Sequence, residues 1–106
     1  MTNYTVRLQC AADRDAAHDL AADFDAIADA LFELGGVHDQ DLDADLTEGT
    51  VIFTMGVVAD RESVALDRAL GGVRTALHAA GRGTPGWERH YRLLRQEVEE
   101  HPVAAR

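Results

Sequence analysis

Apolar and polar residues alternate strictly over residues 4–10, and this pattern predicts a strand with one buried and one exposed face. From about residue 13 to residue 34 the spacing changes, and apolar residues recur every three or four positions. That period predicts an amphipathic helix, whose other side carries a stripe of aspartates. The pair Gly35-Gly36 follows, and glycine is the residue that most readily ends a helix.

The middle of the chain, residues 37–58, predicts a β-hairpin. Residues 41–46 alternate aspartate with an apolar residue, and residues 47–50 have the composition of a turn. Residues 51–58 are apolar on both sides, as expected for the central strand of a sheet. The aspartate strand is then expected at the edge, where its acidic side chains discourage further strand pairing.

A second helix is predicted to begin with Asp60 as its N-cap and to end before Gly81. Gly71 and Gly72 inside it cost about 1 kcal/mol each relative to alanine. We therefore expect a close approach of another element there, most simply of the sheet. Residues 85–100 are ambiguous, because their periodicity favours a helix, whereas a strand over about residues 90–97 would complete a β-α-β-β-α-β unit. Both readings stay open, and we adopt the strand.

Together these elements predict one α+β domain over residues 1–106. We expect a ferredoxin-like two-layer sandwich, with two helices packed on an antiparallel sheet of three or four strands, in the order 4-1-3-2 if the fourth strand exists. Neither helix covers the second face of such a sheet, and Ile52 and Val58 are predicted to point toward it. Because exposed apolar side chains of this kind mark association, we expect a homodimer to which the C-terminal segment contributes.

One stretch of the chain carries a resemblance to known proteins. Residues 74–88, RTALHAAGRGTPGWE, resemble the end of the second helix in small uncharacterised actinobacterial proteins with the same β-α-β-β-α-β layout. The resemblance covers the final third of the chain best. It implies the fold, and it carries no activity that could be transferred.

The charge of the chain restricts its partners. The formal net charge is −9, and all ten basic residues are arginines. Residues 1–80 hold five arginines against fifteen acids, whereas residues 81–106 hold five arginines against four glutamates. A strongly acidic body repels nucleic acid, whose binding depends on cation–phosphate contacts. We therefore expect no direct binding of DNA or RNA.

The compartment is predicted from what the sequence contains. Cys10 is the single cysteine and forms no internal disulfide. We recognise no signal peptide and no apolar run of the roughly 20 residues that cross a bilayer. The expectation is a cytoplasmic protein that makes no use of a membrane.

Motifs that resemble catalytic or ligand-binding sites fail when their spacing is checked. An EF-hand loop starting at Asp39 needs glycine and glutamate at its sixth and twelfth positions, which are Ala44 and Thr50. Residues 81–86 read G-x-G-x-x-G but follow a helix and include a proline, unlike a dinucleotide-binding loop. The five histidines are not spaced as metal ligands, and Cys10 is expected on a buried strand face. We assign no catalytic, cofactor or metal residue, and we lean against an enzyme.

Two groups of residues remain as candidates for an interaction surface. Trp87 and Arg92 belong to residue types that carry binding energy at interfaces. For Trp87 we favour a position that closes the open end of the core, and a dimer contact is the alternative. The acidic residues could form a negative surface for a basic protein, or imitate the phosphates of a nucleic acid. The acidic candidates are Asp15, Asp19, Asp23, Asp41 and Asp43.

The functional expectation follows from this surface. We expect a non-enzymatic interaction or regulatory module that acts as a homodimer. An acidic inhibitor or nucleic-acid mimic is the first alternative. A small enzyme or ligand-binding domain with a pocket at the dimer interface is the second.

Overall fold

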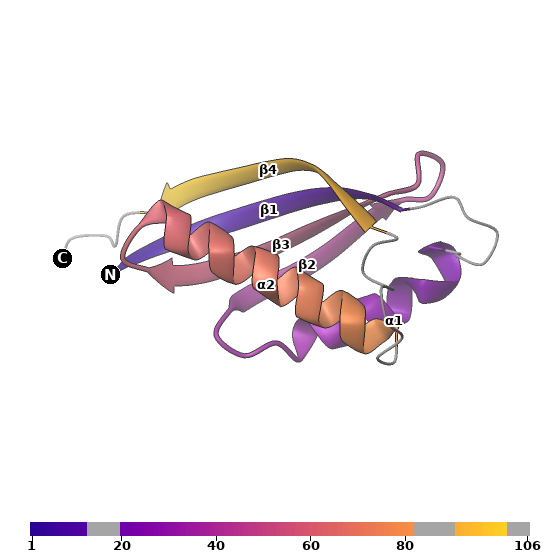
Figure 1. Cartoon of the computed structure of the whole chain (residues 1–106), viewed down its shortest axis with the longest axis horizontal. Helices are drawn as coiled ribbons and strands as arrows, with labels where there is room; N and C mark the ends of the chain where they lie inside the picture. The colour runs from indigo at the N-terminus through magenta and orange to yellow at the C-terminus, as the bar shows by residue number, and fades with distance from the viewer. Residues whose placement is uncertain (13–19, 82–90, 102–106) are drawn as a thin grey trace.

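The computed structural model describes residues 1–12, 20–81 and 91–101. Over these residues the chain runs β-α-β-β-α-β, as Figure 1 shows, and all strand pairs are antiparallel in the order β2-β3-β1-β4. The predicted ferredoxin-like α+β fold and its strand order are therefore confirmed. The elements are β1 (Thr2–Ala12), α1 (Leu20–Phe32), β2 (His38–Asp45), β3 (Thr50–Ala59), α2 (Glu62–Ala80) and β4 (Tyr91–His101).

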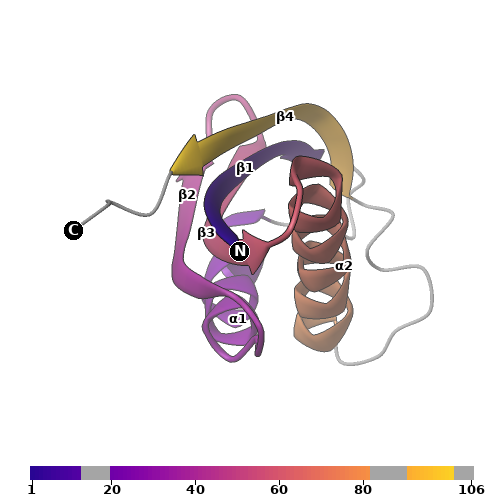
Figure 2. The same cartoon turned by 90° about the vertical axis from the view of Figure 1, so that its left-hand side faces the viewer.

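Both described helices pack on the same face of the sheet, and Figure 2 shows them below it with the opposite face bare. Alternate residues of the two central strands point toward the helices and form the core together with apolar residues of α1 and α2. Phe53 and Leu8 are the largest of the fully buried side chains. The fully or nearly fully buried residues of the strands are Tyr4, Val6, Leu8, Cys10, Val51, Phe53, Met55, Val57 and Ala59.

The last element is a strand, which resolves the ambiguity of residues 85–100 in favour of β4. Its side chains are mostly exposed, since Tyr91 is buried and Val98 is half-buried, and the others are exposed. Because burial is what periodicity reports, the strand leaves little pattern in the sequence. Backbone pairing with β1 over almost its whole length holds β4 in the sheet.

Two details of the helices differ from expectation. The N-cap of α2 is Arg61, in extended conformation and without a side-chain capping bond, so the prediction of Asp60 as N-cap was one residue early. A Cβ on Gly72 would lie 3.2 Å from Cδ1 of Leu34, whereas one on Gly71 would have no neighbour within 4 Å. The close approach therefore involves Leu34, the second residue after the end of α1, and the expected contact with the sheet was wrong.

The end of α1 is held by a side chain from the neighbouring strand. The Nε2 of Gln40 donates to the backbone oxygens of Leu31 and Leu34, at 3.4 and 3.3 Å. Leu31 belongs to the last turn of α1 and Leu34 to the segment that follows, and the oxygen of Leu31 also accepts from the N–H of Leu34 at 3.2 Å. Gln40 thereby fixes β2 to α1 and places both at the same edge of the molecule.

Candidate functional site

We call the side of the sheet that neither described helix covers the open face (Figure 2). Residues directly opposite each other on antiparallel strands point to the same side, so the strand register defines rows that cross the sheet from β2 to β4. The rows are Asp45–Thr50–Ala11–Arg92, Asp43–Ile52–Gln9–Arg95, Asp41–Thr54–Arg7–Glu97 and His38–Gly56–Thr5–Glu99.

Opposite charges occupy opposite sides of this face. The β2 side carries carboxylates at every second residue, from Asp41 to Asp45. The other side, formed by β1 and β4, carries three arginines and two glutamates and so has a net positive charge: Arg7, Arg92, Arg95, Glu97 and Glu99. Glu97 lies 3.0 Å from Nε of Arg95 and 3.8 Å from a guanidinium nitrogen of Arg7. Exposed pairs of this kind contribute at most about 1 kcal/mol each to stability. Their consequence is electrostatic, because one glutamate between two arginines leaves a group of net charge +1.

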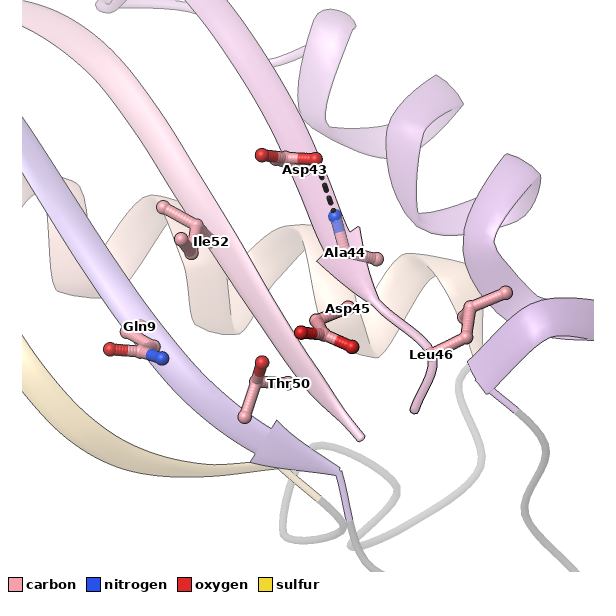
Figure 3. Close-up of a pocket in the computed structure, with 7 residues that line it drawn as sticks. All are labelled: Gln9, Asp43, Ala44, Asp45, Leu46, Thr50 and Ile52. Carbon is pink, nitrogen blue, oxygen red and sulfur yellow. Dashed lines mark hydrogen bonds between the residues drawn. The ribbon is translucent and has the colours of Figure 1, made fainter. Parts of the chain in front are cut away.

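The open face is hollowed along its acidic side. A depression of about 460 Å³ is lined by residues of β1, β2 and β3, among them Gln9, Asp43 and Ile52. Figure 3 shows Ile52 and Thr50 on β3, between Gln9 of β1 and the two aspartates of β2. A second depression of about 170 Å³ adjoins it, shares Gln9 and Ile52, and reaches Arg95. Both depressions are open to solvent, so together they form a shallow trough. Asp43 and Asp45 of β2 line one side, which we call the acidic wall, and Arg7 and Arg95 line the other.

Backbone contacts hold the acidic wall in place. The backbone N–H groups of Thr47 and Glu48 donate to Oδ1 of Asp45, both at 3.0 Å, and fix the turn between β2 and β3. The N–H of Ala44 donates to Oδ1 of Asp43, also at 3.0 Å (Figure 3). Asp43 and Asp45 therefore each use one carboxylate oxygen in local hydrogen bonds to the backbone, and both residues line the larger depression.

A histidine that the sequence did not single out lies at the far end of the acidic wall. The register of β2 shifts between His38 and Asp41, where Asp39 has a positive φ of 51°. Two residues of β2 then oppose one of β3, as in a β-bulge, and this returns His38 to the open face. Its Nε2 lies 3.0 Å from Oδ1 of Asn3, and its Nδ1 lies 3.1 Å from Oδ2 of Asp39.

The imidazole of His38 lies directly on Gly56. A Cβ at that glycine would fall 2.6 Å from Nδ1 and 2.7 Å from Nε2 of the ring, which is closer than real side chains approach. A glycine inside a strand is a recognised signal of such an approach, and Gly56 in the middle of an otherwise apolar strand could have revealed the histidine. On the neighbouring strands, Oγ1 of Thr5 lies 2.8 Å from Nε2 of His101.

The structure brings some of the predicted surface residues together and separates others. Asp41, Asp43 and Arg92 share the open face, at opposite sides of the sheet. Asp23 belongs to α1, on the other side of the sheet. The remaining candidates, Asp15, Asp19 and Trp87, lie outside the described residues. Ile52 and Val58 do point to the open face, where Val58 is 41% exposed, but most of that face is polar.

The buried side of the sheet holds a thiol of low reactivity. Cys10 is only 4% exposed, and burial raises the pKa of its thiol to about 11. Burial, with smaller contributions from Asp23 and Cys10, also raises the pKa of Tyr91. Both residues line a hollow of about 120 Å³ between α2, β1 and β4, with Arg74 at its side. The predicted inward orientation of Cys10 is confirmed, and a protonated thiol is a poor nucleophile.

Within residues 1–12, 20–81 and 91–101, no three side chains of histidine, cysteine, aspartate or glutamate are grouped so that they could hold a metal ion. None of the helices in those ranges is long and apolar enough to span a bilayer.

Comparisons with known proteins support the fold alone. No protein-family model matches the chain, and no curated protein matches it. Among solved structures it is similar to the crystal structure of PA3566 from Pseudomonas aeruginosa, with a TM-score of 0.52 and 17% sequence identity. The match covers 99% of this chain and 97% of PA3566. The two proteins thus share the β-α-β-β-α-β architecture from end to end.

Proposed function

We propose that the chain is a non-enzymatic interaction module that works as a homodimer, and that two copies meet through the open face. The observation that carries this proposal is the open face itself, which is bare, hollowed and divided between negative and positive charge. A surface with both signs of charge can bind a second copy of itself, because each sign finds its opposite on the partner. A uniformly acidic face could not.

The size of the face suits a dimer of moderate affinity. Four strands about 4.8 Å apart, each contributing about eight residues of about 3.3 Å, give a flat footprint of about 500 Å² per copy. Side-chain relief adds to this area, and specific interfaces of standard size bury about 800 Å² per partner. We therefore expect a dimer that dissociates on dilution, with Ile52 and Val58 as its apolar contacts.

Light scattering over a range of concentrations tests the proposal. The wild-type protein is expected to approach twice the mass of one chain as its concentration rises. Ile52→Asp, at the centre of the open face, is expected to shift the equilibrium to the monomer. Phe32→Asp is the matched control, because Phe32 is 57% exposed on α1, away from that face.

A folding check completes the test. Circular dichroism compares each variant with the wild-type protein, and Val58→Asp replaces Ile52→Asp if the latter loses structure, because Val58 is the more exposed of the two. A wild-type protein that stays at the mass of one chain up to its solubility limit would refute the homodimer.

A second candidate function, the capture of a basic protein, is favoured by the position of α1. Since Gln40 fixes β2 to α1, the exposed Asp25 and Asp29 of the helix lie at the same edge as the acidic strand. Affinity capture from the source cells, read by mass spectrometry, tests this alternative with the predicted acids neutralised together. Unchanged capture by that variant would remove it. The neutralised positions are Asp15, Asp19, Asp23, Asp41 and Asp43.

An enzyme is the less favoured alternative, because the two depressions on the open face are open to solvent and the buried thiol of Cys10 is protonated near neutral pH. The proposal includes a cytoplasmic location, which rests on the single cysteine and on the sequence alone. The resemblance of residues 74–88 to actinobacterial proteins stays a prediction and adds no activity.

A further inference from the structure

We propose that the two copies are related by a twofold axis parallel to the strands, so that β2 of each copy lies over β4 of the other. This inference rests on the proposed homodimer and adds to it the geometry by which one copy recognises the other. The order of charges across the sheet selects that geometry over its alternative.

Sheets that pack face to face have only two simple twofold arrangements. Aligned sheets lie about 10 Å apart with their strands within about 30° of each other, so the axis must lie between the sheets, either across the strands or along them. An axis across the strands places each strand over its own copy. Asp41, Asp43 and Asp45 would then face the same three carboxylates of the partner, a repulsion that the alternative avoids.

A twofold axis along the strands reverses the order of the strands in the partner. It leaves each row at the same position along the strand direction. Each row of the open face then lies over the same row of the partner, read in the opposite direction. Asp43 faces the partner's Arg95, and Asp45 faces the partner's Arg92. The row that contains Gly56 places His38 against the partner's Glu99.

The remaining row, which runs from Asp41 to Glu97, brings two carboxylates together, but nearby arginines offset their repulsion. Asp41 faces the partner's Glu97, which is a like charge. The same glutamate lies 3.0 Å from one arginine nitrogen and 3.8 Å from another within its own chain. What Asp41 meets is therefore a cluster of two arginines and one glutamate with a net positive charge.

The twist of the sheets leaves these pairings within reach. The outer strands lie about 7 Å from the axis, so a rotation of about 30° displaces them by about 3.6 Å, roughly one residue along the strand. A long arginine side chain spans that displacement.

The charges also occupy the part of an interface that tolerates them. They lie mainly on the two outer strands, and Arg7 is the one charged residue that the rows place on the two central strands, which otherwise supply threonines, Ala11, Ile52, Gln9 and Gly56. Charged pairs at the rim of an interface stay in contact with water, so they set orientation and association rate more than affinity. Salt is accordingly expected to slow association and to weaken the dimer.

A charge-swap experiment tests this geometry. The first variant, Asp43→Arg with Asp45→Arg, carries arginine on both outer strands. The second, Arg92→Asp with Arg95→Asp, carries aspartate on both. Each variant alone opposes like charges at four positions, and we expect its dissociation constant to rise at least about tenfold. When the two are mixed, all four positions become complementary, and we expect a one-to-one heterodimer with an affinity near that of the wild-type dimer.

The control separates register from net charge. Asp25→Arg with Asp29→Arg makes the same change in charge on exposed positions of α1, away from the open face. Mixed with Arg92→Asp plus Arg95→Asp, it is expected to give no high-affinity heterodimer. Native mass spectrometry identifies the pairs, sedimentation velocity measures their affinities, and circular dichroism confirms that each variant is folded.

The outcomes distinguish this inference from the proposal beneath it. A wild-type protein that is monomeric throughout refutes the homodimer and the geometry together. A wild-type dimer whose two swapped variants fail to pair, or pair no better than the control, refutes the geometry and leaves the homodimer standing. Selective pairing of the swapped variants supports both.

Discussion

The contact between His38 and Gly56 allows a prediction whose sign depends on one neighbouring side chain. Gly56→Ala adds a methyl group where the imidazole lies, so the ring must move away from Asn3 and Asp39. Each hydrogen bond contributes about 0.5–1.5 kcal/mol, and the lower end applies because the side chain is 43% exposed. The loss of about 1 kcal/mol is offset by the gain of about 0.5–1 kcal/mol from replacing glycine in a strand. The net effect on unfolding free energy is near zero.

Removing the ring changes this balance. In a His38→Ala background, Gly56→Ala meets no imidazole and is expected to stabilise the protein by about 0.5–1 kcal/mol. Gly56 is outside the positive-φ region, so alanine fits its backbone. The coupling between the two substitutions is therefore expected at about 1 kcal/mol. Urea unfolding of the wild type, both single variants and the double variant, all at one protein concentration, measures it.

The result that contradicts this reasoning is an equal effect of Gly56→Ala in both backgrounds, within about 0.3 kcal/mol. Gly71→Ala provides the calibration, because its Cβ would have no neighbour within 4 Å. It is expected to stabilise α2 by about 1 kcal/mol whether or not His38 is present.

Three further predictions concern the buried side of the sheet. Phe53→Ala, at a fully buried position, is expected to cost about 3–5 kcal/mol of unfolding free energy in urea titrations. Gln40→Ala removes two hydrogen bonds at the end of α1 and is expected to cost about 1–2 kcal/mol, with faster amide exchange there. Cys10 should react slowly with a thiol reagent at pH 8, because a pKa of about 11 leaves about one thiol in a thousand ionised. Since the unfolded thiol ionises near pH 9.0, stability is expected to fall between pH 9.0 and about 11, less steeply in Cys10→Ala.

The parts of the fold that bury apolar residues could be predicted from the sequence. The alternation of residues 4–10 and the apolar run of residues 51–58 correspond to the two central strands, β1 and β3, whose inward residues form the core. The strand β4 could be expected only from the logic of the layout. Its exposed side chains carry no period, and its place depends on hydrogen bonds to a strand at the other end of the chain.

The candidate site was predicted only in part, for a related reason. The sequence indicates acids on one strand and an arginine near the C-terminus, but which residues lie opposite each other is a property of strand register. The bulge at Asp39 moves His38 from the helix-facing side of the sheet to the open face. Alternation in the sequence does not show this shift, and so His38 was missed. Gly56 was the available signal, because a glycine inside a strand often marks a bulge or a close approach.

The order of the strands also has a consequence for the order in which the chain folds and dimerises. The hairpin of β2 and β3 pairs residues that are close in sequence, whereas β1 pairs with β4 across nearly the whole chain, from Asn3 to His101. Contacts at such separation form late, because the chain must first close a long loop. Arg92 and Arg95 arrive with this last strand. A chain on which β4 has not yet paired with β1 would display the acidic groups of β2 without the arginines of β4, and it would repel other molecules like itself. Under the proposed geometry, two copies can therefore dimerise only after β4 has joined the sheet.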